Sequence, residues 1–206
     1  MYIPESFRID DQEIVDKFLT DYPFATLVSK SGGDITHMPL IRRPDGRLEG
    51  HFAGNNPHRK MVLSASDMDV VAVFHGPHAY ISPTWYAAGQ EAVPTWNYAS
   101  VHVHGVICPF ATDQELQDHF HRLVEVFEGE RSPRWSLTNI SQDFFVNLSR
   151  AVVGFSIEMH SIEAKFKLGQ NRKSGDILGF INALSRSNLA SDRDFADFAS
   201  RFTNRD

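Results

Sequence analysis

The chain has 206 residues, of which 42% are hydrophobic and 22% charged, an ordinary composition for a globular protein that buries a sizeable core. Its formal net charge of −6 argues against a broad basic face for DNA, because Lys and Arg contacts to phosphates dominate such binding. No apolar run approaches the ~18 residues of a membrane span, and the N-terminus lacks a secretion signal. The single cysteine, Cys108, excludes an internal disulfide framework, so we expect a cytoplasmic protein without a membrane segment.

The first quarter of the chain predicts one amphipathic helix and a three-stranded meander. The helix opens at residues 10–13 with Asp10 as its cap, and its apolar face consists of Ile14, Phe18 and Leu19. Turns rich in Gly, Pro and Asp separate the antiparallel strands, which are expected at residues 24–30, 35–43 and 47–53.

The middle of the chain predicts a short helix followed by further strands. Pro57 fits the first position of one or two helical turns at 58–64, with Asn56 as the cap. The apolar run at 69–75 predicts a strand, and Gly76-Pro77 predicts a turn into 79–82. Residues 95–108 predict a long strand, with Val101 and Val103 on one face and His102 and His104 on the other.

The last part of the chain predicts helices around one more strand. A capping box at 112–115 opens a helix that runs to about 128, and Ser141 caps a helix that ends at 150. Residues 152–167 predict a strand, and two short helices follow from Ser174 on. At least six mostly antiparallel strands with peripheral helices indicate a mainly β (α+β) fold, and closure into a barrel would remove the sheet edges.

Aromatic residues are concentrated at 79–105, where two similar motifs occur, SPTWY (82–86) and VPTWNY (93–98). Trp and Tyr bury large areas and carry one polar group each, so beside Ser, Thr and Asn they form a surface suited to a flat ligand. The alternative is a packed hairpin whose aromatic side chains fill a core. Residue types alone leave both interpretations open.

The segment 50–61 predicts an anion site. A strand end followed by a helix start leaves backbone N–H groups free, and Asn56 and Lys60 lie beside them. The alternative is an ordinary Asn-Pro helix cap. His102 and His104 share one strand face, but no third metal ligand is apparent in the sequence, so we expect no metal. No hydrolase elbow, phosphate-binding glycine loop or dinucleotide fingerprint is present.

Five strings together resemble the PaiB family of FMN-binding negative transcriptional regulators. They are MYIPESF (1–7), GHFAGNNPHRK (50–60), YISPTWY (80–86), VPTWNYASVHVHG (93–105) and FKLGQNR (166–172). The resemblance implies an antiparallel split β-barrel of the pyridoxamine-phosphate-oxidase-like type and a homodimer with FMN in a cleft between the subunits. It also implies a flavin-binding barrel domain at 1–168 and a C-terminal helical extension at 169–206.

Carried over motif by motif, the resemblance implies a set of cofactor-binding residues. Asn56 and Lys60 would face the FMN phosphate. Ser82, Thr84, Trp85 and Tyr86 would line the ribityl chain or the ring. Thr95, Trp96, Asn97 and Tyr98 would close the site, and Gln170 and Asn171 would approach the isoalloxazine edge. Two glycines depart from the family's usual residues: Gly54 replaces a frequent arginine and Gly169 a common serine.

The leading function is therefore a flavin-binding negative transcriptional regulator whose further partner is DNA or a regulatory protein. An FMN-dependent oxidoreductase is the alternative, in which the protein orients the cofactor and the cofactor carries out the chemistry. A haem-binding split barrel is a third hypothesis, in which the axial haem ligand is one of His75, His78, His102 and His104.

Overall fold

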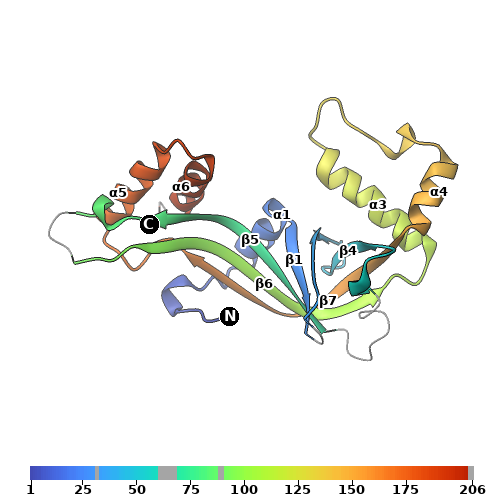
Figure 1. Cartoon of the computed structure of the whole chain (residues 1–206), viewed down its shortest axis with the longest axis horizontal. Helices are drawn as coiled ribbons and strands as arrows, with labels where there is room; N and C mark the ends of the chain where they lie inside the picture. Colours follow the sequence, from blue (N-terminus) through green and yellow to red (C-terminus); the bar gives the residue numbers. More distant parts are fainter. Residues whose placement is uncertain (31–32, 60–68, 88–90, 204–206) are drawn as a thin grey trace. The chain divides into compact units, whose positions relative to one another are not determined.

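The computed structural model describes residues 1–30, 33–59, 69–87 and 91–203 (Figure 1). The chain divides into two compact units. Unit 1 consists of Met1–Phe18, His75–Val101 and Glu163–Asp206, and unit 2 consists of Leu19–Phe74 and His102–Ile162. Each unit thus combines segments that are far apart in the sequence.

Within the described ranges, seven strands form one sheet in the order β2-β1-β5-β6-β7-β4-β3. They are β1 (Phe24–Ser29), β2 (Ile35–Pro39), β3 (Ile41–Arg42), β4 (Leu48–Ala53), β5 (Asp69–Ile81), β6 (Thr95–Pro109) and β7 (Val152–Lys167). Strand β1 pairs with β2 and β5, and β4 pairs with β3 and β7, each time antiparallel. The predicted antiparallel, mainly β fold with peripheral helices is confirmed.

The helices come mainly before the sheet and in the second half of the chain. They are α1 (Gln12–Asp21), α3 (Asp113–Glu128), α4 (Gln142–Arg150), α5 (Ser174–Ser185) and α6 (Ala190–Thr203), with short 3-10 turns η1 (Glu5–Phe7), η2 (Pro83–Trp85) and η3 (Leu137–Asn139). None of the helices in the described segments is long and apolar enough to cross a bilayer.

The core of unit 2 follows the period-two alternation of its strands. Leu27 on β1 lies opposite Ala72 on β5, and neither side chain has exposed surface. The Phe52 and Phe155 rings of the neighbouring strands β4 and β7 lie 4.8 Å apart between centroids. Burying one such ring contributes roughly 1.5–3 kcal/mol, so these alternating positions hold the sheet of this unit together.

Helix α3 begins where its capping sequence predicts. The Thr112 hydroxyl accepts a hydrogen bond from the Glu115 backbone N–H at 3.2 Å, which satisfies one of the unpaired donors of the first turn. The helix buries Phe120, whose ring meets Phe145 of α4 edge to face at 5.7 Å. This aromatic pair joins α3 to α4 within unit 2.

The core of unit 1 is a cluster of phenylalanines from three elements. Phe166 at the end of β7 lies 5.0 Å from Phe18 of α1 and 5.4 Å from Phe198 of α6, measured between ring centroids. Helix α5 packs beside α6, as Figure 1 shows, and buries Phe180 completely. The two predicted C-terminal helices are therefore confirmed as elements that add to this core.

The predicted turn at Gly76-Pro77 is wrong, because β5 continues through both residues to Ile81. A Cβ at position 76 would lie 2.5 Å from the Phe18 ring. The glycine is required by close packing of α1 on the strand and not by a turn.

The single strand expected at 35–43 is two strands, β2 and β3, interrupted at Leu40. The Leu40 N–H donates to the Pro23 carbonyl at 2.9 Å, and its side chain is buried. Strand β2 then pairs with β1 and β3 with β4, so the expected meander is broken in the middle. The tight turn at Pro44-Asp45-Gly46 is confirmed, with Gly46 at φ +88°.

The cap of α1 is Asp11 and not Asp10. The Asp11 carboxylate accepts from the Glu13 N–H at 2.9 Å and from the Ile14 N–H at 3.3 Å. With the start shifted by one residue, Val15 joins Phe18 and Leu19 on the buried face, whereas Ile14 stays partly exposed.

Candidate functional site

Ten of the twelve predicted cofactor-binding residues lie in unit 1. They occupy three short segments, residues 82–86, 95–98 and 167–172, which we call the aromatic-basic cluster. The segments come from η2, the start of β6 and the turn after β7, and Figure 1 shows these elements at the same end of unit 1 as α5.

The first motif, SPTWY, folds into η2. Ser82 caps this turn: its hydroxyl accepts from the Thr84 N–H at 3.3 Å and lies 2.8 Å from the Thr84 hydroxyl. Pro83 occupies the first position, where its missing N–H costs nothing. The Ser-Pro-Thr sequence therefore builds a defined turn that holds Trp85 and Tyr86.

Helix α5 fixes η2 from one side. A Cβ at Gly179 would lie 2.2 Å from the Trp85 carbonyl oxygen, so the two backbones approach as closely as only a glycine permits. The Ala87 N–H donates to the Asp176 carboxylate at 2.9 Å, and Asp176 is buried. The C-terminal helices thus position the aromatic residues of the first motif.

Two cations lie among the aromatic residues of the cluster. The Arg172 guanidinium is 4.8 Å from the centroid of the Tyr86 ring, in cation–π contact. The Lys167 ammonium donates to the Thr95 hydroxyl and, at 2.9 Å, to the Trp96 carbonyl. Burial lowers the pKa of Lys167, and the neighbouring charges of Lys165 and Arg172 act in the same direction.

Strand β6 begins within the second motif, VPTWNY, whose residues alternate between the two faces of the strand. Trp96 is 50% exposed, and its ring lies 5.7 Å from His78 and 6.3 Å from Tyr80 on β5. Asn97, in contrast, is buried, 3.7 Å from where a Cβ at Gly169 would lie. The exposed Trp96 ring is therefore an open stacking surface, with His78 and Tyr80 packed at an angle beside it, whereas Asn97 faces the interior.

Tyr98 continues the face of Trp96 and meets a third cation. The Lys165 ammonium lies 5.2 Å from the Tyr98 ring centroid and 5.6 Å from that of Tyr2. It also donates to the Tyr2 carbonyl at 3.1 Å. Lys165 is buried, so these contacts hold the N-terminal segment against β6 and β7.

The turn after β7 depends on Gln170 and Gly169. The Gln170 side chain accepts from the Leu168 N–H at 2.7 Å and donates to the Phe166 carbonyl, so both ends of its amide stabilise the turn. Gly169 has φ +90°, a conformation that side-chain-bearing residues rarely adopt. Asn171 is exposed beside this turn.

The predicted phosphate segment lies in unit 2. The Asn56 side chain accepts from the His58 N–H at 3.0 Å and donates to the Thr36 hydroxyl at 3.2 Å. Thr36 in turn lies 2.8 Å from Nδ1 of the buried His58. Asn56 is therefore the helix cap that the alternative interpretation predicted, and Lys60 falls outside the described residues. Gly54 is tightly placed as well, because a Cβ there would lie 2.7 Å from the Ala151 carbonyl oxygen.

The chemistry of the aromatic-basic cluster fits a flavin. An isoalloxazine ring needs a flat partner, which the half-exposed Trp96 ring provides, with His78 and Tyr80 beside it at 36° and 63° to its plane. Its carbonyl oxygens and its phosphate need donors with positive charge, which Lys167 and Arg172 provide. When bound, the flavin would supply one- or two-electron redox chemistry that no side chain of the cluster has.

Residues 1–161 match the family model described as "Putative FMN-binding domain". The chain belongs to this family. FMN is accordingly its cofactor, as the resemblance implies. Among curated proteins, the chain is 34% identical over 189 residues to the protease synthase and sporulation protein PAI 2 of Bacillus subtilis (strain 168), which covers 89% of each chain. It is also 25% identical over 202 residues to an uncharacterised protein of Aspergillus fumigatus, covering 82% of this chain and 74% of that one.

Solved structures agree on the fold. The flavocytochrome Anf3 from Azotobacter vinelandii superposes with a TM-score of 0.61 at 15% identity, covering 79% of this chain and 70% of that one. The FAD and heme binding protein from Mycobacterium smegmatis gives 0.60 at 14% identity, covering 83% and 78%. The predicted antiparallel split β-barrel is confirmed.

Lys167 and Arg172 were not among the residues predicted from the sequence. Both lie in the motif FKLGQNR (166–172), in which the family resemblance implies Gln170 and Asn171 as the residues that approach the flavin. Alternation along β7 was the available signal, since it places Lys165 and Lys167 on the same face of the strand. The structure shows that this face meets the start of β6 through Tyr98 and Thr95.

Proposed function

We propose that this FMN-binding split barrel acts as a PaiB-type negative transcriptional regulator, with the aromatic-basic cluster as part of its flavin site. The likeness to PAI 2 over nearly the whole of both chains supports the regulatory role. The Lys167 ammonium at the backbone carbonyl of the half-exposed Trp96 supports the flavin site most directly. A stacking ring and a cation near the same residue are two features that hold a flat ligand carrying negative charge.

Flavin binding by the cluster is tested with single substitutions. Trp96→Ala removes the stacking surface and is expected to weaken FMN affinity up to about tenfold. Lys167→Met keeps the length of the side chain but removes its charge, and a loss of tenfold or more is expected. Fluorescence quenching of free FMN measures both.

Two matched controls accompany these variants. Lys173→Ala removes an exposed cation close to Arg172, and Trp135→Ala removes a partly exposed tryptophan of unit 2. Both should bind FMN like the unchanged protein. If Trp96→Ala and Lys167→Met also bind FMN like the unchanged protein, the flavin lies elsewhere.

An assembly of two copies is part of the proposal. On the outer side of the β1–β2 hairpin, Phe24 is 64% exposed and Ile35 is 60% exposed, and the Phe24 ring stacks on His37 at 6.4 Å. Exposed apolar groups that gather on one hairpin are typical of a contact with another protein. Sedimentation of the purified protein would show a dimer, and a monomer at all concentrations would contradict it. The cytoplasmic location and the division at residue 168 stay predictions.

Because the net charge is −6, regulation of transcription would need either a local basic patch that contacts DNA or a second protein that binds DNA. Selection of bound fragments from the genomic DNA of the source organism, at two salt concentrations, separates these cases. Enriched fragments whose binding weakens steeply with salt would support direct contact with DNA. No enrichment, together with capture of a DNA-binding protein, would indicate an indirect role.

An FMN-dependent oxidoreductase is the second candidate, and Lys167 favours it. A cation close to the flavin ring stabilises the negative charge that the ring gains on reduction. Bleaching of the bound flavin by NADH or NADPH would support this function, and a flavin that no nicotinamide nucleotide reduces would argue for a regulator. The same spectra would reveal a haem by its Soret band.

A further inference from the structure

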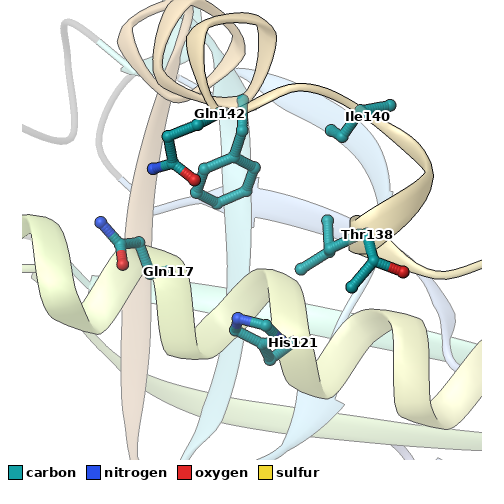
Figure 2. A pocket seen from close by; sticks show the side chains of 7 residues that line it. Gln117, His121, Thr138, Ile140 and Gln142 are labelled. Carbon is teal, nitrogen blue, oxygen red and sulfur yellow. The ribbon is translucent and has the colours of Figure 1, made fainter.

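Unit 2 contains a hollow that has no part in the aromatic-basic cluster. It lies between α3 and the segment that includes η3 and the start of α4, and its cavity volume is about 240 Å³. Its lining residues are Gln117, His121, Leu137, Thr138, Ile140, Gln142 and Phe145 (Figure 2). All of them belong to unit 2. We propose that this hollow binds a small, neutral, planar molecule with an amide or lactam edge.

Three polar side chains turn toward the hollow with free hydrogen-bonding groups. Figure 2 shows the carboxamides of Gln117 and Gln142 facing each other from α3 and α4, with His121 one turn further along α3. Within the described ranges, no hydrogen bond engages the side chains of these three residues. Each carboxamide offers an acceptor and a donor, which is the pattern that an amide edge complements.

The charged residues of α3 next to the hollow already have hydrogen-bond or ion-pair partners. Asp118 accepts a hydrogen bond from Gln114 at 2.9 Å, and Arg122 binds the Glu49 carboxylate. Glu125 pairs with Arg134. None of the seven lining residues is Asp, Glu, Lys or Arg. His121 is the one titratable side chain among the seven, so no permanently charged group awaits a charged ligand, which would lose hydration on entering; the ligand is therefore neutral.

The walls of the hollow suit one flat ring. Leu137 and Ile140 line it from the η3 segment, and the Phe145 ring, which is only 8% exposed, lines it from α4. At about 240 Å³ the cavity lies just below the ~300–1,000 Å³ typical of small-molecule sites. This volume fits a six-membered ring with one substituent.

The wall formed by η3 is preorganised by its own hydrogen bonds. The Ser136 hydroxyl accepts from the Thr138 N–H, and the Asn139 side chain accepts from the Ser136 N–H at 2.7 Å. The Thr138 hydroxyl also donates to the Ser136 hydroxyl, so the proton of Thr138 is already used. A wall that is ordered before binding loses little entropy when a ligand enters.

The test uses benzamide and uracil as neutral probes and benzoate as the anion that matches benzamide in shape. Chemical-shift titration of the Gln117 and Gln142 side-chain NH₂ signals should show saturable binding of both neutral probes, with a Kd in the millimolar range for ligands of this size. Benzoate should bind at least about tenfold more weakly than benzamide.

Substitutions then place the binding site. Gln117→Leu and Gln142→Leu should each weaken benzamide binding about fivefold, the effect of one lost hydrogen bond. Gln114→Leu is the matched control, since its amide lies on the same helix but bonds to Asp118, and it should leave the affinity unchanged. No saturation by either neutral probe up to ~20 mM would overturn the proposal. So would benzoate binding as tightly as benzamide, or unchanged affinity in both glutamine variants with native spectra.

Discussion

The ion cluster around Glu49 in unit 2 makes Arg122 a sensitive point for stability. Glu49 lies on β4 with no exposed surface, and the Arg122 guanidinium of α3 binds its two carboxylate oxygens at 2.7 Å each. Arg43 lies 3.5 Å away on one side and His119 Nδ1 3.2 Å away on the other. Burial raises the pKa of Glu49, but the contacts with His119 and Arg122 outweigh it, so the pKa lies below its ordinary value.

Arg122→Ala is expected to lower the free energy of unfolding of unit 2 by about 3 kcal/mol. Removing one partner of a buried pair leaves a charge without compensation, at a cost of roughly 3–5 kcal/mol, and Arg43 retains part of the compensation here. For a chain of this length the loss corresponds to about 6–12 °C in Tm. Thermal and urea unfolding, followed by far-UV circular dichroism near neutral pH, measure it.

The effect must also depend on pH. A carboxylate whose pKa is lowered in the folded state contributes stability above its unfolded pKa, near 4.5, and loses it as the pH falls through the folded pKa. Arg122→Ala raises the folded pKa of Glu49, so the difference from the unchanged protein should be largest above that pH and shrink below it. A constant difference would mean that Arg122 acts by packing alone.

The controls separate charge from bulk. Arg131→Ala removes an arginine whose side chain is 68% exposed and contacts Glu128 and the Phe127 carbonyl, so it should change stability by less than ~0.5 kcal/mol. The double variant Glu49→Leu/Arg122→Leu should be more stable than Arg122→Ala, because neither charge is left alone. A loss in Arg122→Ala no greater than in Arg131→Ala would refute the reasoning.

Two further predictions follow from the same structure. Burial and the neighbouring His119 lower the pKa of His51 to about 4, so its imidazole weakens the fold as the pH drops from about 6.5 toward 4. His51→Asn, which cannot titrate, should flatten the unfolding free energy over that interval, and an unchanged pH profile would contradict this. Gly179→Ala places a Cβ 2.2 Å from the Trp85 carbonyl oxygen and should cost about 1–3 kcal/mol, with altered tryptophan fluorescence. Gly175→Ala on the same helix meets nothing within 4 Å and should be neutral or stabilising; equal effects at both positions would exclude the backbone contact as the cause.

Periodicity in the sequence predicts most elements of this fold, and its failures share one physical cause. Val101 and Val103 are buried as the alternation predicts, and Thr112 caps α3 as its capping box predicts. The turn predicted at Gly76 is absent from the structure, because a glycine required by a neighbouring ring cannot be distinguished in the sequence from a glycine required by a turn. Local patterns report local structure, and they cannot report which distant residue approaches a backbone.

The candidate site shows the same limit more clearly. The motifs SPTWY and VPTWNY identify where the aromatic residues are concentrated. Strand geometry, however, turns Trp96 outward and Asn97 inward. Gln170 looks like a ligand in the sequence, yet its amide is used by its own turn. Lys167 lies three residues before Gln170, the nearest predicted position, and it reaches the Trp96 carbonyl 71 residues away in the chain. Only the fold reveals that contact.

The two glycines that depart from the family's usual residues have causes in the backbone of this chain. Gly169 adopts φ +90°, and a Cβ there would lie 2.9 Å from the Phe180 ring. A serine at this position would carry a conformational cost of roughly 1 kcal/mol before any hydroxyl contact formed. Gly54 likewise lies against the Ala151 carbonyl. Both glycines fit close packing in their own units, so neither departure is in itself a sign that the flavin has been lost. Lys167 and Arg172 still supply positive charge in the aromatic-basic cluster.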